Sequence, residues 1–182
     1  SLGFSERIAA VALGAVDIAC AILTMTPERA RRVAFAHPHG MISTVLVTTW
    51  QRPIATVDEL SRRPVAGRSG VVAGLARHLP RDIESLVIED YEEALALLLA
   101  GEAAAPVLPI TAFRRLALAH PEAQLHKLRT LAEAPYAVAL PHGEPDLQHF
   151  LNTWVFMREE DGTFAALHEA FLEAPRPIVP RL

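Results

Sequence analysis

The stretch Asp17–Phe35, DIACAILTMTPERARRVAF, decides the fold because it joins an apolar segment directly to a helix start. Residues 17–23 are predicted to form a strand, followed by a helix over 27–32 with Thr26 as N-cap and a proline at the first helical position. Backbone N–H groups, a hydroxyl and the guanidinium of Arg29 collect where this helix begins. Because a guanidinium grips a carboxylate through two parallel, charge-assisted hydrogen bonds, the pattern indicates a carboxylate site. A capped surface helix with a solvated Arg29 would show the same pattern.

The composition is that of a folded α/β protein without a charged binding face. The chain has 182 residues, 51% of them hydrophobic, which is enough for one domain or two small lobes. A net charge of -4 argues against a nucleic-acid or anionic-membrane footprint. Charges such as Asp17 and Glu102 interrupt the apolar runs, so no segment is expected to span a bilayer. The single cysteine, Cys20, is expected to be a small buried side chain in the first strand.

The rest of the chain alternates predicted helices and strands. Helices are expected over 5–13, 56–60, 71–78, 91–100, 111–118, 146–158 and 163–172, and strands over 38–47, 64–66, 85–88, 105–108 and 136–140. Asp90 is expected to cap one helix and Gly101 to end it. Such alternation predicts parallel strand pairing, and it can close as one doubly wound sheet or as two small sheets.

Five segments, in order along the chain, resemble the periplasmic solute-binding proteins of the polar amino-acid and organic-acid ABC transporter family, family 3. They are Asp17–Phe35, Phe35–His39 (FAHPH), Ile88–Ala94 (IEDYEEA) with Gly101–Glu102, Pro135–Gly143 (PYAVALPHG), and Leu151–Trp154 (LNTW) followed by Asp161–Thr163. The resemblance implies the two-lobed, type 2 periplasmic-binding fold of the α/β class, with two hinge crossings near 39–44 and 134–138.

The implied lobes are discontinuous in sequence. Lobe one comprises residues 1–42 plus 136–182, and lobe two, residues 43–135, is inserted into it. The family begins with a strand, a helix and a second strand that have no counterpart before Ser5. The resemblance therefore also implies that the first strand-helix-strand of lobe one is missing, so that the chain is N-terminally incomplete.

In this family a small carboxylate ligand lies between the lobes, and the resemblance assigns the binding roles residue by residue. Thr24 and Arg29 correspond to the lobe-one hydroxyl and guanidinium that hold an α-carboxylate. In lobe two, Gly70 corresponds to the glycine of a turn that donates to the same carboxylate. Val71 replaces the hydroxyl residue that follows this glycine, and its helix start can still offer N–H groups, while Ser69 is a possible substitute.

Three positions depart from the family pattern. Ile22 stands where the family has a small or polar residue, and Ala104 and Pro109 stand where it has two acids. The second acid pairs with the α-ammonium of the ligand, and an ammonium buried without a counter-charge is strongly destabilised. Three alternatives follow: a ligand without an amine, an acid supplied from elsewhere, or binding that is vestigial.

The implied function is capture of a small carboxylate, amino-acid-like or an organic acid, in the periplasm and its delivery to the membrane permease of an ABC importer. No cofactor, nucleic-acid partner or enzymatic activity is expected. One alternative is a degenerate accessory or sensor domain of the same fold that binds another periplasmic protein. A cyclohexadienyl-dehydratase-like enzyme is a further alternative, but the general acid it needs would come from the position of Pro109.

Histidines at the inferred hinge raise the question of a metal site. His37 and His39 share one face of an extended segment, and His142 from the neighbouring strand would complete an open site. Pro38 between the first two prevents regular strand pairing, so no metal site is expected.

Overall fold

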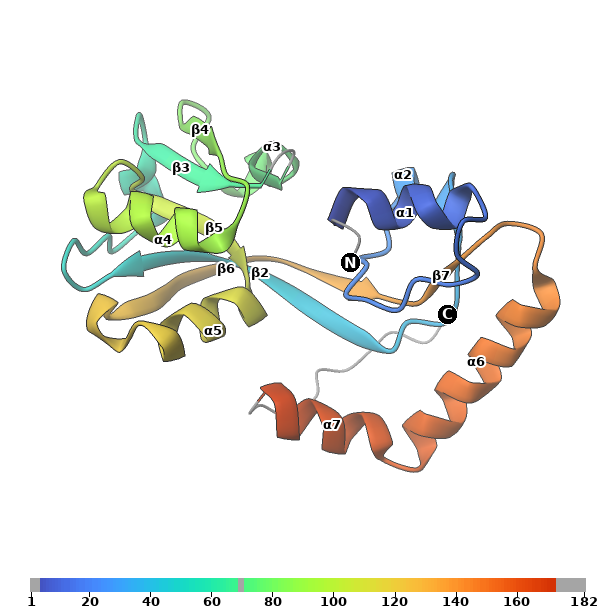
Figure 1. The fold of residues 1–182 in the computed structure, drawn as a ribbon. Helices are drawn as coiled ribbons and strands as arrows, with labels where there is room; N and C mark the ends of the chain where they lie inside the picture. The colour runs from blue at the N-terminus through green and yellow to red at the C-terminus, as the bar shows by residue number, and fades with distance from the viewer. Residues whose placement is uncertain (1–3, 69–70, 173–182) are drawn as a thin grey trace. The chain divides into compact units, whose positions relative to one another are not determined.

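The structure, a computed structural model, describes residues 4–68 and 71–172, which fold into two compact units (Figure 1). Unit 1 contains Ser1–Ile42 and Ala134–Leu182, and unit 2 contains Ser43–Glu133. The chain passes from one unit to the other within β2 (Gly40–Thr49) and returns within β6 (Leu125–Tyr136).

Unit 2 is built on a sheet whose strand order, among the described residues, is β4-β3-β5-β2-β6. Strand β3 (Pro64–Gly67) is parallel to both of its neighbours, β4 (Glu84–Val87) and β5 (Ala105–Pro109). Strand β2 is antiparallel to β5, with Val45 opposite Leu108. The prediction of uniform parallel pairing is therefore wrong for β2. This strand enters the sheet directly from unit 1, without the crossover helix that forces parallel pairing.

Alternation along the strands gives the sheet of unit 2 two apolar faces. Val45 and Val47 pack with α4 (Tyr91–Ala100) and α5 (Ile110–Ala119), whereas Leu46 joins a second buried cluster. The short helices of this unit are η1 (Val57–Leu60), α3 (Val71–Gly74), η2 (Ala76–His78) and η3 (Pro121–Ala123). The first two contribute Leu60 and Val72 to the second cluster. The predicted helix over 71–78 is thus broken into two, and Gly74 stands at the break.

Helix α4 has both of its predicted ends. The Asp90 carboxylate accepts the Glu93 N–H at 2.8 Å, which caps the first turn. Gly101 ends the helix in the left-handed conformation, at a φ of 81°. Both sequence predictions are confirmed.

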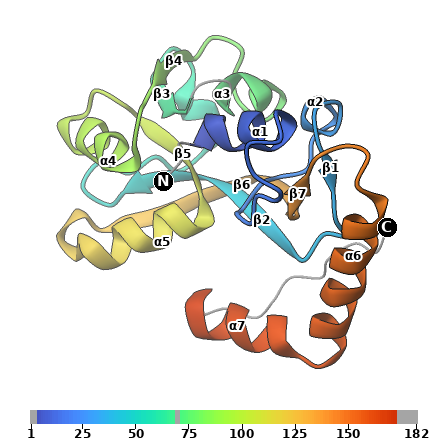
Figure 2. The same cartoon turned by 45° about the vertical axis from the view of Figure 1, so that its right-hand side comes forward.

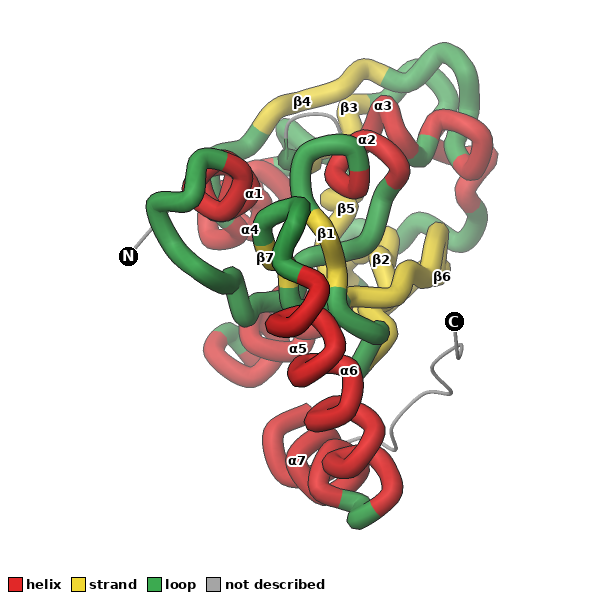
Figure 3. The backbone as a smooth tube through the Cα atoms, turned by 90° about the vertical axis from the view of Figure 1, so that its right-hand side faces the viewer, coloured by secondary structure: helices red, strands yellow, loops and turns green. Residues whose placement is uncertain are grey.

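Unit 1 has less strand and more helix. Its elements, besides the ends of β2 and β6, are α1 (Phe4–Ala12), α2 (Pro27–Ala30), β1 (Ala34–Phe35), β7 (Ala139–Leu140), α6 (Pro145–Glu160) and α7 (Thr163–Leu172). Strands β1 and β7 pair antiparallel, with Phe35 opposite Ala139 (Figure 2). Helix α6 is anchored through Leu151, which packs with Leu140, and it leads by a short turn into α7 (Figure 3).

The predicted strand over 17–23 is not a continuous strand. Two isolated bridges replace it. One joins Ala19 to Ala139 of β7, and the other joins Thr24, the residue after the predicted strand, to Tyr136 at the end of β6. A turn within the segment, in which the Leu23 N–H donates to the Ala21 carbonyl at 2.8 Å, breaks the regular ladder. The prediction that Cys20 is buried is also wrong, because this side chain is exposed.

Candidate functional site

Thr24 and Arg29, the two residues predicted for unit 1, are in direct contact. Nη1 of Arg29 donates to the Thr24 carbonyl oxygen at 2.7 Å and also to the Thr24 hydroxyl oxygen. Both residues are partly buried. The two bonds hold the Nη1 end of the guanidinium against Thr24.

Helix α2 holds Arg29 in place through the capping chemistry that the sequence predicts. The backbone of Thr26 is extended, and its hydroxyl oxygen accepts the Arg29 N–H at 3.3 Å. Pro27 occupies the first helical position. Backbone hydrogen bonding, and then the Thr26 hydroxyl, lower the pKa of Glu28 in the same turn. The helix ends at Ala30, so Arg29 lies in its single turn.

The electrostatics of Arg29 favour an anion. Burial lowers the pKa of its guanidinium, but an arginine keeps its charge throughout the physiological range. A partly buried cation has lost some of its hydration, and a carboxylate can replace that water with charge-assisted hydrogen bonds. The planar fork of the guanidinium matches the two oxygens of a carboxylate in a way that a lysine does not.

The backbone around Thr24 is supported by a segment far along the chain. The Met25 N–H donates to the Pro135 carbonyl at 2.9 Å, and the Ala137 N–H donates to the Leu23 carbonyl at 3.2 Å. Between them, Thr24 and Tyr136 form an isolated antiparallel bridge. Sequence reasoning identified this segment as the return crossing but missed its contact with Thr24, for which no local pattern gives a signal.

Unit 2 contains the other predicted site residues. Val71 is the first residue of α3, and its N–H donates to the Arg68 carbonyl at 2.9 Å. This N–H is therefore already hydrogen-bonded to the protein. The remaining two predicted residues, Ser69 and Gly70, lie outside the described residues.

The two positions at which the resemblance expects acids have other roles. Ala104 is 8% exposed and joins the second core cluster. Pro109 ends β5 opposite Thr44 and is the N-cap residue of α5, where no side chain caps the helix. Neither residue can pair with an ammonium.

The hinge histidines do not gather around a metal. Among residues 4–68 and 71–172, no group of three or more His, Cys, Asp or Glu side chains could hold a metal ion. His39 packs among aromatic rings, edge-on to Tyr136 with 4.9 Å between ring centroids and stacked on Phe164 at 5.7 Å.

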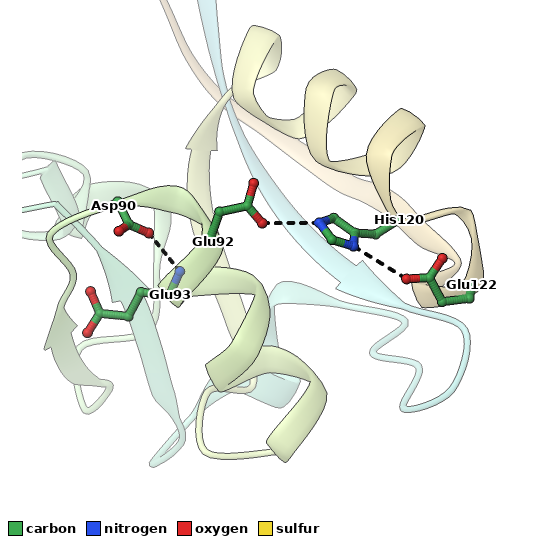
Figure 4. A network of polar contacts seen from close by, with 5 residues as sticks. All are labelled: Asp90, Glu92, Glu93, His120 and Glu122. Atoms are coloured by element: carbon green, nitrogen blue, oxygen red, sulfur yellow. Dashed lines mark hydrogen bonds and ion pairs between the residues drawn. The ribbon is translucent and has the colours of Figure 1, made fainter.

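A separate polar network lies at the start of α4 and is shown in Figure 4. His120 Nε2 is 3.1 Å from Glu92, and its Nδ1 is 3.4 Å from Glu122. These contacts tie α4 to the end of α5 and to η3. They involve none of the predicted site residues, so the network is an interaction within unit 2.

Comparison with known proteins places this geometry in context. The model of the bacterial extracellular solute-binding proteins, family 3, matches residues 1–174. No curated protein matches the sequence. Among residues 4–68 and 71–172, none of the helices combines the length with the apolar character that a membrane span requires.

Solved structures share the fold. A mutant of ArgBP from T. maritima is 23% identical, with a TM-score of 0.80 over 96% of this chain and 76% of that one. The L-cysteine solute receptor of Neisseria gonorrhoeae is 23% identical, with a TM-score of 0.77 over 92% and 68%. AncCDT-1, an ancestral amino acid-binding protein and precursor of cyclohexadienyl dehydratase, is 22% identical, with a TM-score of 0.81 over 93% and 75%.

These likenesses show the type 2 periplasmic-binding fold that the sequence resemblance implies. The family model extends over nearly the whole chain, including Thr24 and Arg29 in unit 1 and Val71 in unit 2. The protein belongs to the bacterial extracellular solute-binding proteins, family 3.

Proposed function

We propose that this protein captures a small carboxylate in the periplasm and delivers it to the membrane permease of an ABC importer. The ligand is amino-acid-like or an organic acid. Support comes from family membership and from the structures that share the fold, among them a receptor for L-cysteine and a transporter component from Wolinella succinogenes complexed with lysine. Cysteine and lysine have an α-carboxylate in common, and a guanidinium can bind a carboxylate through two parallel hydrogen bonds.

The contact between Arg29 and Thr24 is the observation that carries this proposal. A ligand carboxylate accepts hydrogen bonds from the guanidinium, whose orientation is set before binding by its bonds to Thr24. The Thr24 hydroxyl accepts from Arg29 and donates its own proton to the carboxylate, since a hydroxyl does both at once. In this proposal residues 69–71 of unit 2, Ser69, Gly70 and Val71, provide the second part of the carboxylate site.

The amine of an amino-acid ligand is the point at which this protein differs from the family pattern. Pro109 provides no carboxylate, and an unpaired ammonium in a dry site is costly. The proposed ligand class therefore includes carboxylates without an amine, such as keto acids, dicarboxylates and aromatic acids. An amino acid remains within the class if another acid pairs with its ammonium.

A second candidate is a degenerate accessory or sensor domain that binds a periplasmic protein in place of a solute. The bond from the Val71 N–H to the Arg68 carbonyl favours it, because that N–H is then already hydrogen-bonded within the protein. The absence of a hydroxyl at Val71 and of an acid at Pro109 points the same way. Pro109 also cannot act as the general acid of a dehydratase, which leaves the enzymatic alternative without a proton donor at that position.

The test is thermal shift followed by calorimetry against amino acids, keto acids, dicarboxylates and aromatic carboxylates. A ligand at 100 times its dissociation constant stabilises the folded state by about 2.7 kcal/mol. Arg29→Ala should abolish the shift, and Arg29→Lys should not restore it, because lysine lacks the planar fork. Arg32→Ala is the matched control, since Arg32 is an exposed arginine three residues further on and should bind like wild type.

A shift with one ligand class that disappears in Arg29→Ala would establish carboxylate capture and identify the chemistry of the ligand. Equal binding by wild type and Arg29→Ala would contradict the role of the guanidinium. If none of the ligand classes raises the melting temperature, solute capture of small carboxylates is excluded and the protein-partner alternative takes its place.

A further inference from the structure

Tyr136 and Gly40 touch at the place where the chain passes between the units. Gly40 begins β2 and Tyr136 ends β6, and both belong to unit 1. A Cβ atom added to Gly40 would overlap the Cζ, Cε1 and hydroxyl oxygen atoms of the Tyr136 ring. Gly40 is buried, so the ring lies directly on its backbone and leaves no room for a side chain.

The backbone of Tyr136 is bonded on both sides. It forms the antiparallel bridge with Thr24, and its carbonyl oxygen accepts the His39 N–H at 3.2 Å. The flanking bonds from Met25 to Pro135 and from Ala137 to Leu23 extend the pairing by one residue in each direction. The backbone at Thr24 is therefore paired with the backbone at Tyr136.

The ring of Tyr136 is partly buried and has packing partners of its own. The His39 ring packs edge-on against the Tyr136 ring. Phe164 of α7 in turn stacks on His39, with 5.7 Å between the ring centroids. Gly40 lies against one side of the ring and His39 lies beside it, so a side chain at position 40 would have to displace the ring. Contacts of this kind transmit small displacements because packed side chains have little free volume.

We propose that Tyr136 is a positioning residue for carboxylate binding. Its ring, seated on Gly40, fixes the backbone of Thr24, so that the Thr24 hydroxyl and the Arg29 guanidinium are held in binding geometry before the ligand arrives. Such preorganisation raises affinity because less ordering has to occur on binding. The affinity part of this inference rests on the proposed function, whereas the contact itself can be tested without any ligand.

Gly40→Ala is the direct test. The added methyl group must displace the Tyr136 ring, so the pairing of residues 135–137 with 23–25 should loosen. We expect faster hydrogen exchange at the Met25 and Ala137 amides in the ligand-free protein, and at least about a tenfold loss of carboxylate affinity by calorimetry. Gly74→Ala is the matched control, because a Cβ on Gly74 meets no atom within 4 Å. That variant should leave both measurements unchanged.

A second variant separates positioning from general damage. Leucine at position 136 lacks the outer ring atoms that meet the new methyl group, so Gly40→Ala with Tyr136→Leu should regain part of the affinity that Gly40→Ala loses. Tyr136→Leu alone should speed exchange at the same two amides, and it provides the measurement if Gly40→Ala does not fold.

Wild-type exchange at both amides together with wild-type affinity in Gly40→Ala would overturn the proposal. So would a double variant whose loss of affinity, relative to wild type, equals the sum of the losses in the two single variants. If the amides exchange faster in Gly40→Ala while the wild-type protein binds no carboxylate, the contact between Tyr136 and Thr24 is supported and the proposed function fails.

Discussion

Thr24→Val removes the hydroxyl at the centre of the candidate site and leaves the rest of the residue in place. Valine has the same shape and favours the extended backbone that Thr24 adopts in its bridge with Tyr136. The Arg29 guanidinium keeps its bond to the carbonyl oxygen of residue 24, at 2.7 Å, and loses its bond to the hydroxyl. The change is therefore confined to one polar atom.

The expected loss follows from that atom. A hydrogen bond to a charged group contributes about 1.5–3 kcal/mol, and the Thr24 hydroxyl makes one to Arg29 and, in the proposed complex, one to the ligand. Because Thr24 is only partly buried, water can replace some of this interaction, and the lower figure applies. We expect carboxylate affinity to fall about tenfold. The free energy of unfolding should fall by less than the corresponding ~1.4 kcal/mol, because Arg29 keeps its bond to the carbonyl oxygen of residue 24.

Calorimetric titration of the ligand found in the thermal-shift screen measures the affinity, and urea denaturation measures the stability. Thr153→Val is the control, because Thr153 is an exposed threonine on α6 and the same substitution there should change neither quantity. Affinity equal to wild type in Thr24→Val would refute the role of the hydroxyl. A loss of stability without a loss of affinity would show that its bond to Arg29 is structural.

Two further predictions concern stability and titration. Gly101→Ala and Gly162→Ala should each destabilise the protein by about 1–2 kcal/mol in urea denaturation, because both glycines have a positive φ, at 81° and 77°, which disfavours any residue with a Cβ atom. Ser61→Ala should raise the pKa of Asp82 in an NMR titration, because the Ser61 hydroxyl donates to this carboxylate at 2.7 Å and is the main cause of its lowered pKa. A carboxyl group whose pKa is lower in the folded than in the unfolded state stabilises the fold at pH values above its unfolded pKa, and this contribution is lost as the pH falls through its folded pKa. Ser61→Ala should therefore make the free energy of unfolding depend less on pH in the acid range.

Elements with their own local signals could be predicted from the sequence. Helix α4 has an N-cap at Asp90 and a terminal glycine at Gly101, and both ends were predicted. Strand β6 was missed because Leu125, Leu128 and Leu131 recur every third residue, which does not fit the two-residue period of a strand. It is a strand because tertiary pairing in the sheet overrides the local pattern.

The candidate site likewise combines a contact between residues close in sequence with contacts between distant segments. Thr24 and Arg29 are five residues apart, on either side of a helix start, so their contact follows from local capping chemistry. The support that Thr24 receives from Tyr136, and the seat of that ring on Gly40, join segments that are distant in sequence. No periodicity or motif encodes such a contact, and a three-dimensional structure is needed to find it.

Pro109 offers a way to test which ligands the site accepts. It is the N-cap residue of α5, its backbone is extended with a φ of -61° and a ψ of 145°, and no side chain caps the helix. Aspartate suits that backbone and is among the best N-cap residues, so Pro109→Asp should stabilise α5 by about 1 kcal/mol while adding the acid that the family pattern has there. Asparagine caps equally well without a charge, which makes Pro109→Asn the matched control.

If the missing carboxylate at position 109 excludes amino acids, the two variants should differ in ligand preference and not in stability. Pro109→Asp should gain affinity for an α-amino acid relative to the matching keto acid, because its carboxylate pairs with the ammonium, whereas Pro109→Asn should keep the wild-type ratio. Calorimetric titration of both ligands against both variants measures this ratio. An equal ratio in the two variants would mean that position 109 does not face the ammonium, and the choice between amino acids and other carboxylates would then have to come from other residues.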